Sequence, residues 1–382
     1  MSWPIVPLGD IAEIERDGVA PEEILPGTPY LGLEHIEQGG RILSRQQVAS
    51  GELASTKFRF SSDHILYGKL RPYLAKIALP DFAGICSTDI VPLRPGEEVN
   101  RQYLAHFLRQ PSMVGYAASR ATGANLPRLS PKALAKFGVP LPPLPEQKRI
   151  AAILDKAEDL CRKQSSFQCQ LRSIVAAEFE HRFSAPHSWQ PLGEVVVDTL
   201  IGLVRGSEEF GRTFAIPYVR MDAISTDGAY LPEKVQNTEA SAEELSRYAV
   251  VEGDLLFNTR NSRELVGKSA VYRGSGAVVF NNNIMRIRLR DGWNSRFLDS
   301  YLRSSKGRQQ LEQRKSGTTS VWAVYWSKLQ TLPVPAVEPE EQANFGEFAD
   351  EVHARLTIGA KRQTYLDNLF AALQHRAFRG EL

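Results

Sequence analysis

Basic and polar side chains gather in the first half of the chain in a way that suits contact with nucleic acid. Lys69, Arg71 and Lys76 form one cluster, with Tyr67 and Tyr73 between them. Such side chains neutralise phosphates, and arginine or asparagine can bond a guanine or adenine edge in bidentate fashion. Between residues 99 and 145 there is no acidic residue, and the basic ones are Arg101, Arg109, Arg120, Arg128, Lys132 and Lys136.

The second half of the chain repeats this segregation of charge. One group consists of Arg260, Arg263 and Lys268, and a later one of Arg303, Lys306, Arg308, Arg314 and Lys315. A single lysine or arginine usually serves only to keep a surface solvated. Because the net charge is only +2, the case for DNA reading depends on the segregation of charge and on its recurrence.

Catalytic signatures are absent from the sequence. It has no phosphate-binding Gly-x-x-x-x-Gly-Lys-Ser/Thr loop, and Gly202, Gly206 and Gly211 have the wrong order for a dinucleotide loop. The seven histidines are scattered and the three cysteines lack metal-ligand spacing. We therefore expect no catalytic residue, metal or cofactor in this chain, although an enzyme with a diffuse site stays open. With no leader or membrane span in view, we expect a cytoplasmic protein.

An internal repeat organises the elements that must position these residues. Residues 191–195 repeat the pattern of residues 7–11, and residues 332–342 repeat that of residues 139–147. The repeat predicts an α+β protein with two similar globular domains, at 1–140 and 186–336. Short strands are expected at 30–33, 64–67 and 89–93, and a helix over 100–115.

Each predicted domain is followed by a long amphipathic helix, within 141–185 and 337–382. A helix of this length spans roughly 50 Å, and Gly359 is expected to weaken the second one. We expect the two helices to pair as an antiparallel coiled coil with pseudo-two-fold symmetry. The alternative is that each helix packs on its own domain. The predicted coiled-coil residues are Ile150, Ile153, Leu154, Ala157, Phe167, Leu171, Ile174, Phe345, Phe348, Val352, Leu366, Leu369 and Leu373.

Three segments, in this order and with the repeat, resemble the specificity (S) subunit of type I restriction–modification systems. They are residues 67–76, residues 139–155 with their Pro-Glu-Gln motif, and residues 376–382. The resemblance implies two target-recognition domains, each reading half of an interrupted double-stranded DNA target, and a coiled coil that sets the spacer. It also implies two modification (M) subunits that use S-adenosylmethionine to methylate adenine N6. Restriction (R) subunits would add ATP- and Mg-dependent cleavage.

The resemblance also implies which residues contact DNA. In the first domain they are Lys69, Arg71, Tyr73, Lys76, Arg120, Thr122, Gly123 and Asn125. In the second they are Arg260, Asn261, Ser262, Lys268, Lys315, Gly317, Thr318 and Thr319. The second domain lacks the Gly-Lys-Leu-Arg-Pro sequence, and the second helix lacks the Ile-Ala-x-Ile-Leu-Asp pattern of the first. The alternative function is a coiled-coil scaffold that binds other proteins and reads no DNA.

Overall fold

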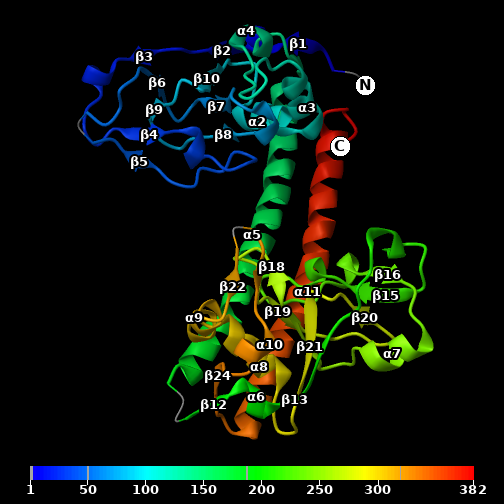
Figure 1. Ribbon diagram of the computed structural model, residues 1–382. Helices are drawn as coiled ribbons and strands as arrows, with labels where there is room; N and C mark the ends of the chain where they lie inside the picture. The colour runs from blue at the N-terminus through cyan, green and yellow to red at the C-terminus, as the bar shows by residue number, and fades with distance from the viewer. Residues whose placement is uncertain (1–2, 50, 186–187, 319) are drawn as a thin grey trace. The chain divides into compact units, whose positions relative to one another are not determined.

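The protein consists of two compact units, each built from one domain and one end of both long helices (Figure 1). The computed structural model describes residues 3–49, 51–185, 188–318 and 320–382. One unit comprises Met1–Lys163 with Gln363–Leu382, and the other comprises Gln164–Arg362. The long helices are α5 (Leu144–Phe183) and α11 (Pro339–Ala377), so each helix contributes residues to both units.

The first unit contains two principal sheets. A four-stranded antiparallel sheet has the order β2 (Ala12–Ile14), β10 (Ile90–Pro95), β7 (Ile65–Gly68), β8 (Ile77–Ala78). A five-stranded sheet has the order β3 (Gly18–Val19), β6 (Lys57–Phe60), β9 (Gly84–Cys86), β4 (Pro29–Leu31), β5 (Gln46–Gln47), in which β4 and β9 run parallel. β1 (Ile5–Pro7) pairs with β11 (Gly138–Pro140) and brings the two ends of the domain together.

Helices and 3-10 turns connect these strands. The helices are α1 (Leu8–Ile11), α2 (Arg101–Arg109), α3 (Pro111–Ser119) and α4 (Pro131–Leu134), and the turns are η1 (Pro21–Glu23), η2 (Leu33–His35) and η3 (Pro72–Leu74). The single helix predicted over 100–115 is wrong. Pro111 has no N–H to donate, and Gln110 before it is extended (ψ 145°), so the segment divides into α2 and α3.

The second unit repeats this plan. Its antiparallel sheet has the order β13 (Val196–Ile201), β21 (Ile284–Leu289), β17 (Leu255–Asn258), β19 (Ser269–Val271). A second sheet has the order β14 (Phe210–Gly211), β16 (Gln236–Thr238), β15 (Ile216–Val219), β20 (Val279–Phe280), with β15 and β20 parallel. A third has the order β18 (Arg260–Asn261), β23 (Trp322–Ala323), β22 (Ser316–Gly317), and β12 (Trp189–Pro191) pairs with β24 (Pro333–Pro335).

The remaining helices of the second unit also correspond to those of the first. α8 (Ser295–Arg303) and α9 (Ser305–Glu312) follow β21 as α2 and α3 follow β10. The others are α6 (Leu192–Val195), α7 (Ala242–Tyr248) and α10 (Trp326–Leu329), with turns η4 (Ser207–Glu209), η5 (Met221–Ala223) and η6 (Pro232–Lys234). No helix among the described residues is both long enough and apolar enough to cross a membrane.

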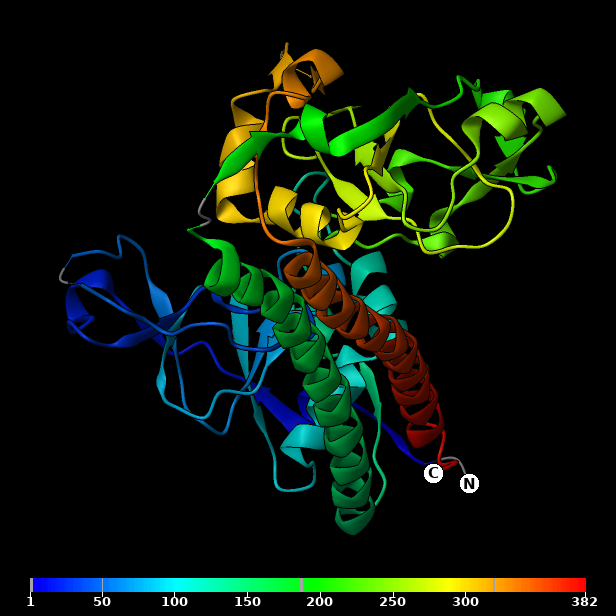
Figure 2. The ribbon, with the colours of Figure 1, turned by 90° about the horizontal axis from the view of Figure 1, so that it is seen from below.

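Within each unit α5 and α11 run antiparallel and share a core with the domain. In the first unit Ile150 and Leu154 of α5 and Ala377 of α11 join the core of the domain, and Figures 1 and 2 show these helix ends beside each other. In the second unit Phe179 of α5 and Phe345 of α11 pack on each other with ring centroids 5.4 Å apart. The helices therefore pack both on each other and on the domain, which combines the two predicted arrangements.

The buried stripe on the helices differs in part from the predicted one. Ile150, Leu154, Leu171, Phe345 and Val352 are buried, and Ile153, Ala157, Phe348, Leu366 and Leu373 are partly buried. Three predicted coiled-coil positions are wrong, because Phe167, Ile174 and Leu369 are 50%, 42% and 41% exposed. In α5 the buried stripe instead runs through Gln168, Leu171, Val175 and Phe179, in helical steps of three and four.

Gly359 lies where α11 meets α5 in the second unit. A Cβ at this position would lie 1.5 Å from Nε2 of Gln168, and Nε2 of Gln164 donates a 3.3 Å hydrogen bond to the Gly359 carbonyl. The glycine does not break α11, which continues to Ala377. It gives the side chains of α5 close access to the backbone of α11.

Candidate nucleic-acid interface

The Lys69–Lys76 segment of the first unit is a partly buried loop with an uncommon backbone. Arg71 (φ 51°) and Ala75 (φ 48°) are left-handed and enclose the η3 turn. This conformation costs a non-glycine residue roughly 1–2 kcal/mol, and a 2.7 Å hydrogen bond from the Arg71 N–H to the Pro127 carbonyl helps to hold it. Arg71 is exposed and Tyr73 is 48% exposed. The loop therefore presents a guanidinium and an aromatic ring to solvent.

The second predicted group of the first unit folds back against this loop. Arg128 forms β-bridges with both Thr122 and Leu70. Gly123 (φ 108°) allows the tight turn between the two sides of the hairpin, and Thr122 and Asn125 are exposed. Arg120 stacks over the Tyr116 ring, 3.4 Å from its centroid. The structure thus brings the two sequence-predicted groups of this domain together.

The second unit has the same hairpin at the same place. Arg260 and Ser316 both pair with Ala323, because β23 lies between β18 and β22. Arg260, Gly317 and Thr318 are exposed. The predicted contact Thr319 lies outside the described residues.

Backbone hydrogen bonds establish which residues of the two hairpins correspond. The Lys69 N–H donates to the Asp89 carbonyl (2.9 Å), as the Thr259 N–H donates to the Asn283 carbonyl (2.8 Å). The Lys69 carbonyl accepts from the Leu129 N–H (2.9 Å), as the Thr259 carbonyl accepts from the Val324 N–H (2.9 Å). In this register Arg71 corresponds to Asn261. The two domains thus place different side chains, one arginine and one asparagine, at one structural position.

Two predicted DNA contacts have their ammonium groups occupied within the fold. Lys76 Nζ donates to the Leu33 carbonyl at 2.7 Å. Lys268 Nζ donates to the carbonyls of Met221 (3.1 Å) and Ile224 (2.6 Å), and burial lowers its pKa. In this fold both lysines support the backbone behind the loop, and their contact with DNA stays a prediction.

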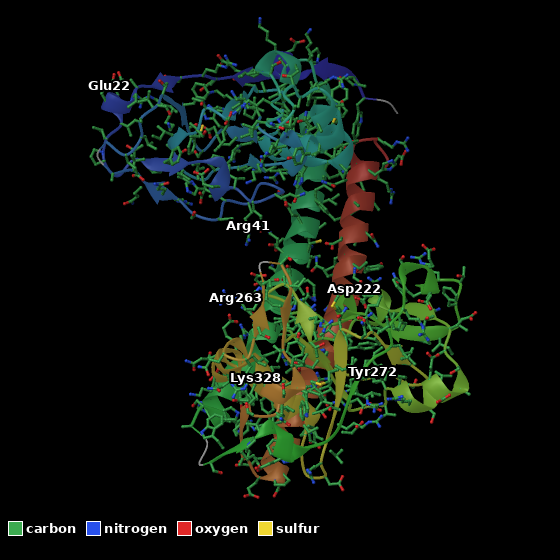
Figure 3. All side chains as sticks on the ribbon, in the orientation of Figure 1. Glu22, Arg41, Asp222, Arg263, Tyr272 and Lys328 are labelled. Carbon is green, nitrogen blue, oxygen red and sulfur yellow. The ribbon has the colours of Figure 1, made fainter. Side chains whose placement is uncertain are left out.

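Lys315 is likewise held within the second unit. Its ammonium donates to the Arg263 carbonyl at 2.7 Å and pairs with Glu312 at 2.9 Å. Hydrogen bonds from Lys315 and Arg263 lower the pKa of Glu312. Arg263, labelled in Figure 3, also lies 4.8 Å from the centroid of the Trp322 ring. Asn261 Oδ1 accepts a hydrogen bond from the Ser262 N–H, so both of these predicted residues shape the turn after β18.

Some residues at the hairpins were not among the predicted contacts. Arg128 is exposed, and Asp89, bonded at 3.0 and 3.3 Å, raises its pKa. Val321 and Tyr325 flank β23 and are 55% and 52% exposed. Charge clustering indicated Arg128 only as part of a basic region, and it gave no signal for uncharged Val321 and Tyr325.

One group among the described residues has metal-ligand spacing. His106, Asp155 and Glu158 place ligand atoms within 4.8 Å of one another. His106 Nε2 lies 2.7 Å from Asp155 Oδ1, and Arg109 lies 3.8 Å from Glu158. Because the Arg109 guanidinium already supplies positive charge there, the group is explained as a network of one hydrogen bond and one ion pair between α2 and α5.

Comparison with known proteins identifies the first half of the chain most directly. Residues 2–165 match the type I restriction modification DNA specificity domain. The EcoDI specificity subunit of Escherichia coli is 27% identical over 176 residues, which cover 46% of this chain and 38% of that protein. The StySPI specificity subunit of Salmonella potsdam is 24% identical over 314 residues, which cover 76% of this chain and 67% of that protein. The match to the EcoDI subunit thus spans well under half of that relative.

Solved structures share the fold over the whole chain. The type I restriction–modification S subunit from M. genitalium has a TM-score of 0.64 at 15% identity, and covers 99% of this chain and 96% of its own. A second structure comes from work on complex assembly and conformational transition of a type I restriction–modification system. It has a TM-score of 0.57 at 22% identity, and the match covers 100% of this chain and 98% of that chain. Residues 2–165 therefore match the type I restriction modification DNA specificity domain, and the chain as a whole shares the fold of solved type I specificity subunits.

Proposed function

We propose that this chain is the DNA-reading subunit of a type I restriction–modification complex, and that each unit reads one half of an interrupted target. The observation that carries the proposal is the repeated exposed hairpin, which pairs Leu70 with Arg128 in one unit and Arg260 with Ala323 in the other. Such hairpins can present side chains to a groove while nearby basic groups position the phosphates.

The two half-sites should differ in sequence. Arg71 and Asn261 occupy equivalent positions, and arginine favours a guanine edge whereas asparagine favours an adenine edge. The residue opposite this position also differs, Pro127 in one unit and Trp322 in the other, and adds to the asymmetry. The resulting target is asymmetric as well as interrupted.

The chemistry is assigned to partner subunits. Two M subunits would hold S-adenosylmethionine and methylate adenine, and R subunits would use ATP and Mg²⁺ for cleavage. A base methylated within a duplex must leave the stack, so this chain holds the DNA while its partners act. The apolar residues exposed on the long helices, Phe167, Ile174 and Leu369, offer docking positions for the M subunits.

Methylation mapping tests the proposal most directly. Cells that carry this chain and its neighbouring methylase should show one interrupted, asymmetric methylated motif. Deletion of the chain should abolish methylation at that motif. Unchanged methylation after the deletion would contradict the proposed function.

The long helices are proposed to set the spacer between the half-sites. Removal of seven residues from each helix, about two turns, should shorten the spacer and leave both half-sites unchanged. Methylome sequencing would report both quantities at once. A change in the half-site bases with an unchanged spacer would contradict this role.

A protein scaffold without DNA reading is the second candidate, and the exposed apolar residues of α5 and α11 favour it. The two candidates differ in how the assembled complex binds duplex DNA. DNA reading predicts strongly salt-dependent binding that weakens when Lys69 and Arg71 are replaced by alanine. Binding that is insensitive to both salt and these changes supports the scaffold.

A further inference from the structure

Gln147, in the first turns of α5, is fully buried and uses its whole amide group in the first unit. Its Nε2 donates to the carbonyls of Glu98 (2.9 Å) and Pro142 (2.8 Å), and its Oε1 accepts from the Asn100 N–H (2.7 Å). The side chain of Asn100 in turn caps α2 by accepting from the Tyr103 N–H. One amide therefore joins the first turns of α5, the segment that leads into it and the start of the domain helix α2.

The second unit contains the same arrangement. Gln342 is 1% exposed, its Oε1 accepts from the Asn294 N–H at 3.1 Å, and its Nε2 donates to the Val337 carbonyl at 2.8 Å. Asn294 caps α8 as Asn100 caps α2. The accepting carbonyl precedes the glutamine by five residues in both repeats. This agreement between two poorly matched sequences argues that the contact is selected for what it positions.

A tertiary hydrogen bond reinforces the contact in the first unit. Tyr103 is fully buried, and its hydroxyl donates to the Pro140 carbonyl at 2.7 Å. In the second unit Gly346 makes room for the cap, because a Cβ there would lie 2.5 Å from Nδ2 of Asn294. Both arrangements restrict the orientation of the long helix, α5 in the first unit and α11 in the second, at the point where it joins its domain.

We propose that Gln147 and Gln342 are positioning residues, which fix the direction in which each long helix leaves its recognition domain and so set how strictly the spacer is measured. This inference rests on the proposed function. An amide that touches no DNA would then control the tolerance for targets of wrong spacing. The bases read in each half-site would be independent of it.

The test compares Gln147→Leu with the wild-type chain in the assembled methylase, on targets whose spacer is one base pair too long or too short. Loss of the buried bonds should lower discrimination against these targets about tenfold and leave half-site preference unchanged. A purely structural role would weaken binding to all targets alike. Gln170→Leu, at an exposed position of the same helix, is the matched control. A folded Gln147→Leu variant with unchanged spacer discrimination overturns the proposal.

Gln147→Glu provides a second test that survives a folding defect in the leucine variant. The introduced carboxylate can accept from Asn100 but cannot donate to the Glu98 and Pro142 carbonyls, whereas its protonated form can donate once. Since burial raises the pKa of a carboxyl group, spacer discrimination should recover partly between about pH 8 and about pH 6. Normal discrimination at about pH 8, where the carboxylate cannot donate, overturns the proposal.

A measurement without DNA separates this inference from the proposed function. One spin label replaces exposed Lys132 on α4 and a second replaces exposed Lys156 on α5. The distance between the two labels in the isolated chain reports how the helix is oriented on the domain. The distance distribution should broaden in Gln147→Leu and stay narrow in Gln170→Leu. If the wild-type complex recognises no interrupted target, the proposed function fails together with the spacer role. The distance distribution then decides only whether Gln147 positions α5: broadening supports that role and an unchanged width overturns it.

Discussion

Lys76 and Lys268 make the same contact in the two repeats: each ammonium group donates to the backbone carbonyl of the first residue of a 3-10 turn, Leu33 in one unit and Met221 in the other. The backbone carbonyls of the same two lysines accept hydrogen bonds from N–H groups at the ends of strands. Lys76 accepts from Gly68, the last residue of β7, and Lys268 accepts from Asn258, the last residue of β17. Each lysine therefore joins the sheet that supports a hairpin to the neighbouring sheet.

Replacement of Lys268 by alanine should destabilise the second unit. The loss of the charge-assisted hydrogen bonds to the Met221 and Ile224 carbonyls should lower the free energy of unfolding by about 2 kcal/mol. Urea denaturation measures this change. Lys132→Ala, at an exposed position, is the control and should have almost no effect. Unchanged stability together with a reduced salt dependence of duplex binding would instead favour a direct contact between Lys268 and DNA.

Substitutions at Arg71 and Asn261 should affect different halves of the target. Arg71→Ala should cost about 1–3 kcal/mol on one half-site and Asn261→Ala a similar amount on the other. Competition binding with duplexes altered in one half at a time measures the two effects separately. Arg41→Ala is the control, because Glu37 already pairs with Arg41 at 2.8 Å. Equal losses on both half-sites would contradict the division of reading between the units.

Phe378→Ala should destabilise the first unit. The ring packs on Tyr103 and Phe107 with centroids 5.3 and 5.4 Å apart, so its loss leaves a space in the core of the domain and should cost about 3 kcal/mol. Thermal unfolding monitors the change, and exposed Arg379→Ala is the control. A variant as stable as the wild type would show that the end of the chain is dispensable for this core.

His353 should make the stability of the second unit fall at acidic pH. Burial, together with nearby Arg296 and Arg303, lowers the pKa of His353 below its ordinary value of 6.5, whereas Asp299 and Asp227 act in the opposite sense. The folded unit therefore keeps the imidazole neutral where the unfolded chain protonates it. Its contribution is fully present above pH 6.5 and is lost as pH falls towards the lowered pKa.

Urea denaturation at a series of pH values measures this effect. Above pH 6.5 the slope of stability with pH should be alike in the wild-type chain and in His353→Gln. Below it the wild type should lose stability more steeply. Exposed His181→Gln is the control and should follow the wild type. Parallel curves for the wild type and His353→Gln would contradict the assignment.

The repeat made much of the fold predictable. The strands at 64–67 and 89–93 correspond to β7 and β10, and the long helices begin and end within a few residues of the predicted bounds. These features depend on local patterns of apolar residues, turn residues and prolines, which the sequence displays directly. The division of 100–115 into two helices was also accessible, because Pro111 stands in the middle of that segment.

Side-chain partners at the hairpins were much less predictable. Whether Lys76 and Lys268 point to DNA or to a carbonyl depends on long-range contacts with Leu33 and Met221, more than forty residues away in each case. The exposure of Phe167 depends on which side of α5 faces α11, and helical periodicity does not specify this for a helix with apolar residues on several sides. The role of Gln147 required the position of Asn100, since the motif alone shows only a polar residue near a helix start.

The first unit is completed by residues that follow the second domain in the chain. Phe378 fills part of its core, and the Leu382 carbonyl accepts a 2.8 Å hydrogen bond from Arg149. A nascent chain that has emerged from the ribosome as far as α5 must therefore keep an apolar surface uncovered until residues 363–382 have also emerged. A ribosome that stalls in α11 beyond Arg362 would release a product whose second unit is whole and whose first is incomplete. Such truncated chains should be aggregation-prone substrates for chaperones and proteases.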